Sequence, residues 1–111
     1  MANAKSDKQI ATLTIKNHRS KISPGGVITL SVAARKTLKM SKGAGNKVLV
    51  ALDQDAVSIT PSNGIGGTRV SPKGMMELQG EARALLEKGE KRHFWLELFD
   101  EKQMVLLHPF N

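Results

Sequence analysis

Apolar residues along this chain come in short alternating or continuous runs, which predicts β-strands in preference to long helices. The segment Ala11–Lys16 alternates polar and apolar positions, as a half-buried strand does. Two further pairs of short apolar segments each flank a polar turn, at 53–55 and at 100–102, and each pair predicts a β-hairpin. The hairpin strands are expected at Lys47–Leu52 with Ala56–Thr60 and at His93–Phe99 with Gln103–His108.

A short helix is expected before each hairpin. Val32–Met40 follows Ser31, whose hydroxyl can accept hydrogen bonds from the free amides of a first helical turn. The second helix is expected over Glu81–Lys88, where Gly89 suits a left-handed C-cap. The buried sides are expected to carry Val32, Ala34 and Leu38 in the first helix and Ala82, Leu85 and Leu86 in the second.

The order of elements recurs because the chain repeats itself at an offset of 48 residues. Such a repeat indicates a duplicated structural unit. Each copy begins with Ser-Pro-x-Gly, a turn sequence, and continues with a short apolar stretch at Val27–Leu30 or Met75–Leu78. Identities fall at Ser23/Ser71, Pro24/Pro72, Gly26/Gly74, Leu30/Leu78, Ala34/Ala82, Arg35/Arg83, Leu38/Leu86, Val57/Val105 and Pro61/Pro109.

The repeat predicts four segments: an N-terminal arm at 1–10, a first unit at 11–61, a glycine-rich linker at 62–68 and a second unit at 69–111. One unit of about 40 residues is too small to bury a sufficient core alone, so the two units are expected to pair. The expected fold class is mostly β with short helices.

Positive charge is concentrated in one half of the chain. Residues 1–52 hold ten Lys and Arg against one acid, whereas residues 53–111 hold seven against nine, and the whole chain carries a formal charge of +7. This asymmetry indicates a polyanionic partner for the first half, with nucleic acid first and an anionic membrane second. The alternative is a solvated basic face that has no partner.

The sequence lacks the residues that several classes of function require. The chain has no cysteine, which excludes disulfides and thiolate chemistry and suits a reducing cytoplasm. The three histidines at 18, 93 and 108 lack metal-ligand spacing, and no serine lies in a nucleophile elbow. No apolar run is long enough to span a membrane. We expect no enzyme, no cofactor, no metal and no small-molecule substrate, and a cytoplasmic, nucleoid-associated location.

The segment Gly26–Leu38 (Gly-Val-Ile-Thr-Leu-Ser-Val-Ala-Ala-Arg-Lys-Thr-Leu) resembles the AbrB/MazE-type swapped-hairpin DNA-binding domain. Arg-Lys-Thr-Leu at its end matches the family's helix segment, and the element order matches across about 11–61. The resemblance implies a double-psi-type β-barrel in which two tandem hairpin–helix units form a pseudo-dimer. It also implies a prokaryotic transcription regulator, a class that includes many antitoxins.

The family often has a basic residue after the turn glycine, where this chain has Val27 and Met75. It often has proline at the helix start, where this chain has Ser31 and Gln79. The first departure weakens any detailed expectation of base contacts.

The resemblance implies that Arg35 and Lys36 face double-stranded DNA. Arg19 and Lys21 flank the turn that enters the first copy, and Lys16 lies nearby. For Arg35 the alternative is an ion pair with a carboxylate of the acidic second half, and for Lys39 a solvated surface. The candidate DNA-binding set is Lys16, Arg19, Lys21, Arg35, Lys36 and Lys39.

All aromatic residues lie in the second half: Phe94, Trp95, Phe99 and Phe110. They are expected to fill the core or a dimer interface, or alternatively to anchor a toxin or another subunit. Two functions therefore remain open, a DNA-binding regulator and a protein-interaction module that binds a partner or a second copy of itself. RNA binding has less support because the basic half holds no aromatic residue for base stacking.

Overall fold

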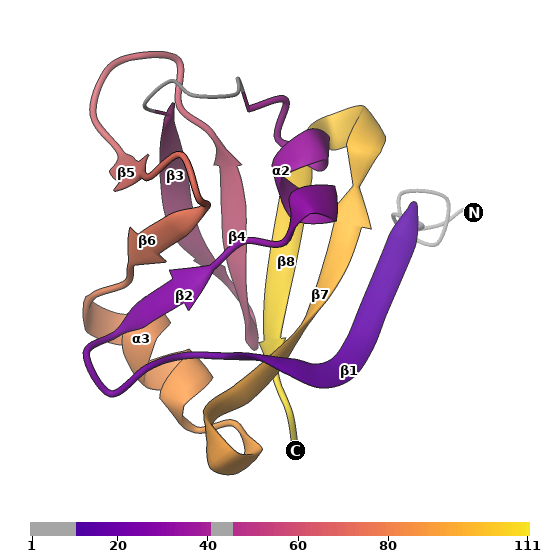
Figure 1. The fold of residues 1–111 in the computed structure, drawn as a ribbon, viewed down its shortest axis with the longest axis vertical. Coiled ribbons are helices and arrows are strands. Elements are labelled where there is room, and N and C mark those ends of the chain that lie inside the picture. Colours follow the sequence, from indigo (N-terminus) through magenta and orange to yellow (C-terminus); the bar gives the residue numbers. More distant parts are fainter. Residues whose placement is uncertain (1–10, 41–45) are drawn as a thin grey trace.

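The computed structural model describes residues 11–40 and 46–111, and the expected N-terminal arm at 1–10 lies outside them. The described chain is mostly β, as expected. Its larger sheet is antiparallel with the order β1-β7-β8-β4-β3-β5, and a second sheet joins β2 to β6 (Figure 1). The strands are β1 (Leu13–Lys21), β2 (Val27–Thr29), β3 (Asn46–Asp53), β4 (Ala56–Pro61), β5 (Thr68–Val70), β6 (Met75–Glu77), β7 (His93–Phe99) and β8 (Met104–Pro109).

Both predicted hairpins are confirmed. β3 and β4 pair around the turn after Asp53, and β7 and β8 pair around the short 3-10 helix η2 (Asp100–Lys102). Side chains alternate across each strand, so Phe94, Leu96 and Leu98 of β7 are buried while the residues between them are not.

The larger sheet maps onto itself when the 48-residue offset exchanges the two halves. The exchange relates β1 to β5, β7 to β3 and β8 to β4, so the strand order reads the same from either edge. At the centre, Val57 of β4 pairs with Leu107 of β8, and Ile59 pairs with Val105. These two pairs are equivalent to one another under the same offset.

The two-stranded sheet has the same relation. Ile28 of β2 pairs with its equivalent, Met76 of β6, and both side chains are buried. Each half therefore supplies one strand, and neither half completes this sheet alone. The buried side chains of the two halves form one continuous core, so the two units share a core.

The first helix, α2 (Val32–Thr37), begins as predicted and ends early. The Ala34 amide donates to the Ser31 hydroxyl at 3.2 Å, which confirms the N-cap. Lys39 has φ 59°, a left-handed value that ends the helix before Met40. The expected burial of Val32 is wrong, because its side chain is 64% exposed.

A buried threonine fixes α2 on the larger sheet. The Thr37 hydroxyl donates to Oδ1 of Asp100 at 2.6 Å, and the Asp100 amide donates to the hydroxyl of Thr12 at 3.0 Å. The contacts link α2, the β7–β8 turn and the residue before β1.

The second helix, α3 (Gly80–Glu87), is followed by a 3-10 helix, η1 (Glu90–Arg92). The expected left-handed C-cap at Gly89 is wrong, since its φ is −63°; Lys91 and Arg92 adopt the positive φ values instead. Glycine is required for space, because a Cβ would collide with the His93 carbonyl and lie 3.1 Å from the Phe110 nitrogen. The expected burial of Leu85 is only partial.

Two strands depart from the sequence pattern. β1 continues past Lys16 to Lys21 across an irregular register between Ile15 and Ser20. β5 lies where the pattern gives no strand, and it pairs with β3 over Asn46–Val48. Pairing with a distant strand determines both segments.

Gly74→Ala should destabilise the fold more than Gly66→Ala. Both glycines have positive φ, which costs an alanine about 1–2 kcal/mol. Only at Gly74 would the Cβ also meet backbone, the Leu30 carbonyl at 2.7 Å. We expect losses of about 3 kcal/mol for Gly74→Ala and about 1 kcal/mol for Gly66→Ala in urea denaturation. Equal losses would contradict the close packing of the two halves at this turn.

Candidate nucleic-acid interface

The two Ser-Pro-x-Gly segments form equivalent turns. In the first, the Ser23 hydroxyl accepts from the Val27 amide at 3.0 Å. In the second, the Ser71 hydroxyl accepts from the Met75 amide at 3.1 Å. A serine and a positive-φ glycine therefore give both turns the same local geometry.

Each turn is held by an arginine from the opposite half. Nη2 of Arg83, on α3, donates to the Pro24 carbonyl of the first turn at 2.7 Å. Arg35, on α2, donates through Nε to the Leu30 carbonyl at 3.1 Å and through Nη1 to the Pro72 carbonyl of the second turn at 3.4 Å. The arginine and the turn that recur in the sequence therefore form two equivalent contacts, in each of which an arginine of one half binds the turn of the other. We call these the exchanged contacts.

Backbone hydrogen bonds run alongside these contacts. The Leu30 amide donates to the Gly74 carbonyl and the Leu78 amide to the Gly26 carbonyl, each at 2.8 Å. An alanine Cβ at Gly26 would lie 3.0 Å from the side chain of Arg83. Glycine therefore allows the arginine to cross the turn.

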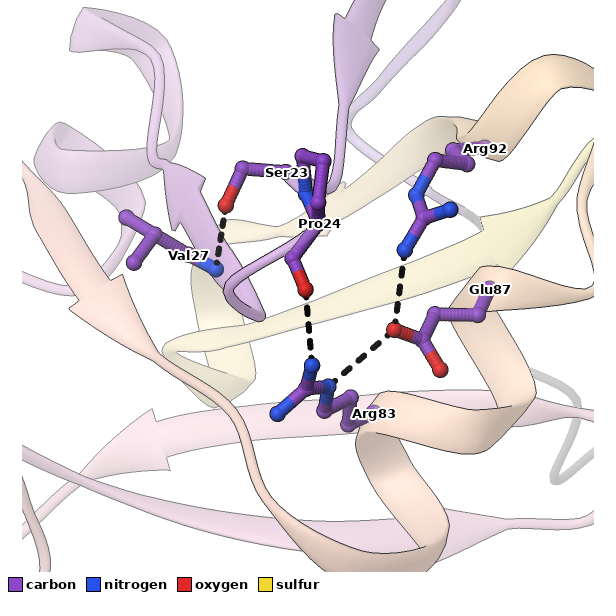
Figure 2. Close-up of polar contacts among 6 residues, drawn as sticks. All are labelled: Ser23, Pro24, Val27, Arg83, Glu87 and Arg92. Atoms are coloured by element: carbon purple, nitrogen blue, oxygen red, sulfur yellow. Dashed lines mark hydrogen bonds and ion pairs between the residues drawn. The ribbon is translucent and has the colours of Figure 1, made fainter.

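The charge around the two arginines differs. Nε of Arg83 donates to Oε2 of Glu87 at 3.1 Å, and Arg92 donates to the same oxygen at 3.1 Å (Figure 2). Arg35 forms no ion pair within the part of the chain that the structure describes. The alternative interpretation of Arg35, an ion pair with the acidic second half, is therefore wrong: its described partners are backbone carbonyls.

Helix length explains part of this difference. α3 extends to Glu87, which is four residues from Arg83 and so lies on the same helix face. α2 ends at Thr37, and the position equivalent to Glu87 is Lys39, which is exposed and outside the helix.

We call Arg35, Lys36, Lys39 and Lys73 the cationic pole. Lys36, Lys39 and Lys73 are exposed. Lys73 follows Pro72, whose carbonyl Arg35 binds, so the exchanged contact brings Lys73 from the second half next to α2. Lys73 was not predicted as a site residue, because its place next to α2 depends on the contact between the halves. Its position as the x residue of the second Ser-Pro-x-Gly is the one signal in the sequence.

The other predicted DNA-binding residues lie along the edge strand β1. Lys16, Arg19 and Lys21 are exposed, and Lys21 pairs with His93 at the end of β1 farthest from Thr12. Lys36 and Lys39 instead line a hollow beside Thr12. The predicted set is therefore divided between two parts of the surface.

The aromatic residues of the second half separate into core and surface. Phe94 and Phe99 are buried, 1% and 6% exposed. Trp95 is half-buried and stacks on His108 with ring centroids 4.1 Å apart, while Nζ of Lys16 lies 4.5 Å from its ring centroid. Phe110 stacks on His18 at 4.0 Å. Strand pairing thus brings Lys16 and His18 of the first half onto aromatic rings of the second, which the sequence did not indicate.

Within residues 11–40 and 46–111, no group of three or more His, Cys, Asp or Glu side chains is placed to hold a metal ion. None of the helices in this part of the chain has the length and apolar character of a membrane span.

The chain matches no protein-family model, no curated protein and no solved structure.

Arg35→Met should destabilise the fold, whereas Lys36→Met should not. Methionine keeps an unbranched apolar stem but cannot donate to the two carbonyls that Arg35 binds. We expect a loss of about 1–2 kcal/mol for Arg35→Met and a change within about 0.5 kcal/mol for Lys36→Met in thermal or urea unfolding. An unchanged stability of Arg35→Met would show that the exchanged arginine contact contributes nothing to the fold.

Proposed function

We propose that the chain is a DNA-binding transcription regulator of the AbrB/MazE-like type, in which the two halves form a pseudo-dimeric, swapped-hairpin double-psi-type barrel within one chain. The support for this architecture is the exchange of contacts between halves: β2 with β6, and each arginine with the opposite turn. Two hairpin units that complete each other in this way correspond to what the sequence resemblance implies.

The observation that carries DNA as the ligand is the charge difference between the two arginine–turn contacts. Glu87 compensates Arg83, but in the described chain no carboxylate compensates Arg35. Lys36, Lys39 and Lys73 add three exposed cations around it. Uncompensated Lys and Arg side chains on a firmly held turn and helix are suited to phosphate oxygens.

The cationic pole lies on one side of the pseudo-symmetric body only. The equivalent positions on the other side are Arg83, Ala84, Glu87 and Gly25, which carry no net charge. The proposal is therefore that one half contacts the phosphate backbone while the other completes the fold. Val27 and Met75, which stand where the family often has a basic residue, contribute no charge to either side.

Of the aromatic residues predicted as a toxin-docking surface, Phe94 and Phe99 are buried and Trp95 is half-buried beneath Lys16 and His108.

The test compares two double variants that remove the same charge. Lys36→Ala/Lys73→Ala removes two cations of the cationic pole and leaves Arg35 in place to support the fold. Lys88→Ala/Lys91→Ala removes two exposed lysines associated with the second helix. Fluorescence anisotropy with a labelled random-sequence duplex, at roughly 50 to 300 mM salt, gives the affinity and its salt dependence.

We expect the slope of log affinity against log salt to flatten by about 2 in Lys36→Ala/Lys73→Ala, because each phosphate contact contributes about 0.9. The slope of Lys88→Ala/Lys91→Ala should stay close to that of the unmodified chain. Equal slopes for the two variants, or no binding by the unmodified chain at the lowest salt, would overturn the proposal.

A further inference from the structure

The two edges of the larger sheet differ in protection. β1 carries Lys16, Arg19 and Lys21 and an irregular register, features that discourage further strand pairing. At the opposite edge, β5 covers only Asn46–Val48 of β3. The outer edge of β3 beyond Val48 is open among the described strands, and Leu49–Leu52 has no charge and no proline there.

The internal symmetry shows what occupies the equivalent edge in the other half. On β7, Leu96–Leu98 pairs with Ile15–Leu13 of β1, and the Thr12 amide donates to the Leu98 carbonyl at 2.7 Å. The residue of β3 that corresponds to Leu98 is Val50. In the described chain, no strand pairs with the outer edge of β3 at Val50.

The linker explains the missing strand. Residues 62–67 correspond to residues 14–19 of β1, but Gly64, Gly66 and Gly67 take φ values of 101°, 71° and 109°. Residues 62–67 form no strand, and the chain pairs with β3 only from Thr68, where β5 begins. The second half therefore lacks the strand that β1 provides to the first.

A groove lies along this open edge. Its volume is about 750 Å³, and Val50–Leu52 lines one side while residues of β6 and α3 line the other. A hollow beside Leu13 and Leu98, which shares only the positions equivalent to Val50, Leu52 and Glu81, measures about 380 Å³. Leu52 lines the larger groove and is 45% exposed. The size and lining fit an extended segment with apolar side chains directed at Leu52.

The charges around the groove favour a basic segment. Glu77 and Glu81 line its β6–α3 side, and neither forms an ion pair within residues 11–40 and 46–111. Arg69 lies at the β5 end. Two uncompensated carboxylates therefore face any strand that pairs with Val50 and Leu52.

We propose that this groove binds an extended, basic segment of a partner polypeptide, which adds to β3 as an antiparallel strand. Backbone groups of Val50 and Leu52 supply the hydrogen bonds, alternate apolar side chains of the partner contact Leu52, and its cations pair with Glu77 and Glu81. This interaction is separate from DNA binding and does not depend on it.

The probe is a synthetic peptide with the sequence of residues 11–21 (Ala-Thr-Leu-Thr-Ile-Lys-Asn-His-Arg-Ser-Lys), the segment that fills the equivalent edge in the first half. It is titrated into the full-length, ¹⁵N-labelled chain. We expect saturable binding, with the largest amide shifts at Val50–Asp53.

Two matched variants locate the site. Leu52→Arg should weaken peptide binding at least about tenfold, since the side chain lines the groove. Leu49→Arg is the control, because Leu49 is 43% exposed on the same strand but is not among the groove residues. Glu77→Gln/Glu81→Gln should weaken binding and reduce its salt dependence.

Binding that does not saturate by about 1 mM peptide would overturn the proposal, as would equal effects of Leu52→Arg and Leu49→Arg. Amide shifts centred on Leu96–Leu98 would mean that the peptide replaces β1 and would overturn the proposal. Self-association of the chain through β3 would make a second copy the occupant and would overturn it as well. Peptide binding should be unchanged in Lys36→Ala/Lys73→Ala, so failure of one proposal is distinguishable from failure of the other.

Discussion

The exchange of contacts between the two Ser-Pro-x-Gly turns holds the structure together. Each turn receives an arginine from the opposite half, and each adjoining glycine carbonyl accepts a backbone amide from that half. These bonds flank the β2–β6 pair, in which Ile28 and Met76 are buried. A half separated from its equivalent would lose one strand of this sheet, the support of its turn and part of its core at once.

The two halves share this geometry but differ in the charges around it. Arg35 and Arg83 occupy equivalent positions and bind equivalent turns, which fixes both side chains for structural reasons. The residues beside them differ: Arg83 pairs with Glu87, which Arg92 also binds, whereas the residues near Arg35 include Lys36, Lys39 and Lys73. The result is a pseudo-symmetric body in which one arginine is paired with a carboxylate and the other is not.

Most elements follow from local sequence. Alternation predicts both hairpins, the serine at position 31 predicts the start of α2, and the repeat predicts that the two halves correspond. What local sequence does not give is set by distant partners. Three residues become β5 because β3 offers an edge, and Gly89 is needed because the chain passes close to His93.

The candidate sites, too, depend on partners that are distant in sequence. Arg35 is recognisable from the helix segment, and one of its backbone partners, Leu30, is close in sequence. The other, Pro72, is 37 positions away and was not predictable from spacing. Lys73 joins the cationic pole, and Lys16 meets Trp95, only because strands from opposite halves are neighbours. Exposure also departs from the helical pattern at Val32, the first residue of α2.

The pairing of β1 with β7 has a consequence for how the chain reaches this state. Leu13 must find Leu98, near the other end of the chain, and Ile28 must find Met76. Contacts between residues so far apart in sequence close large loops before they yield any stabilising energy, which slows folding. During synthesis β1 and β2 leave the ribosome well before their partners, so the first half waits for the second before its sheets can close.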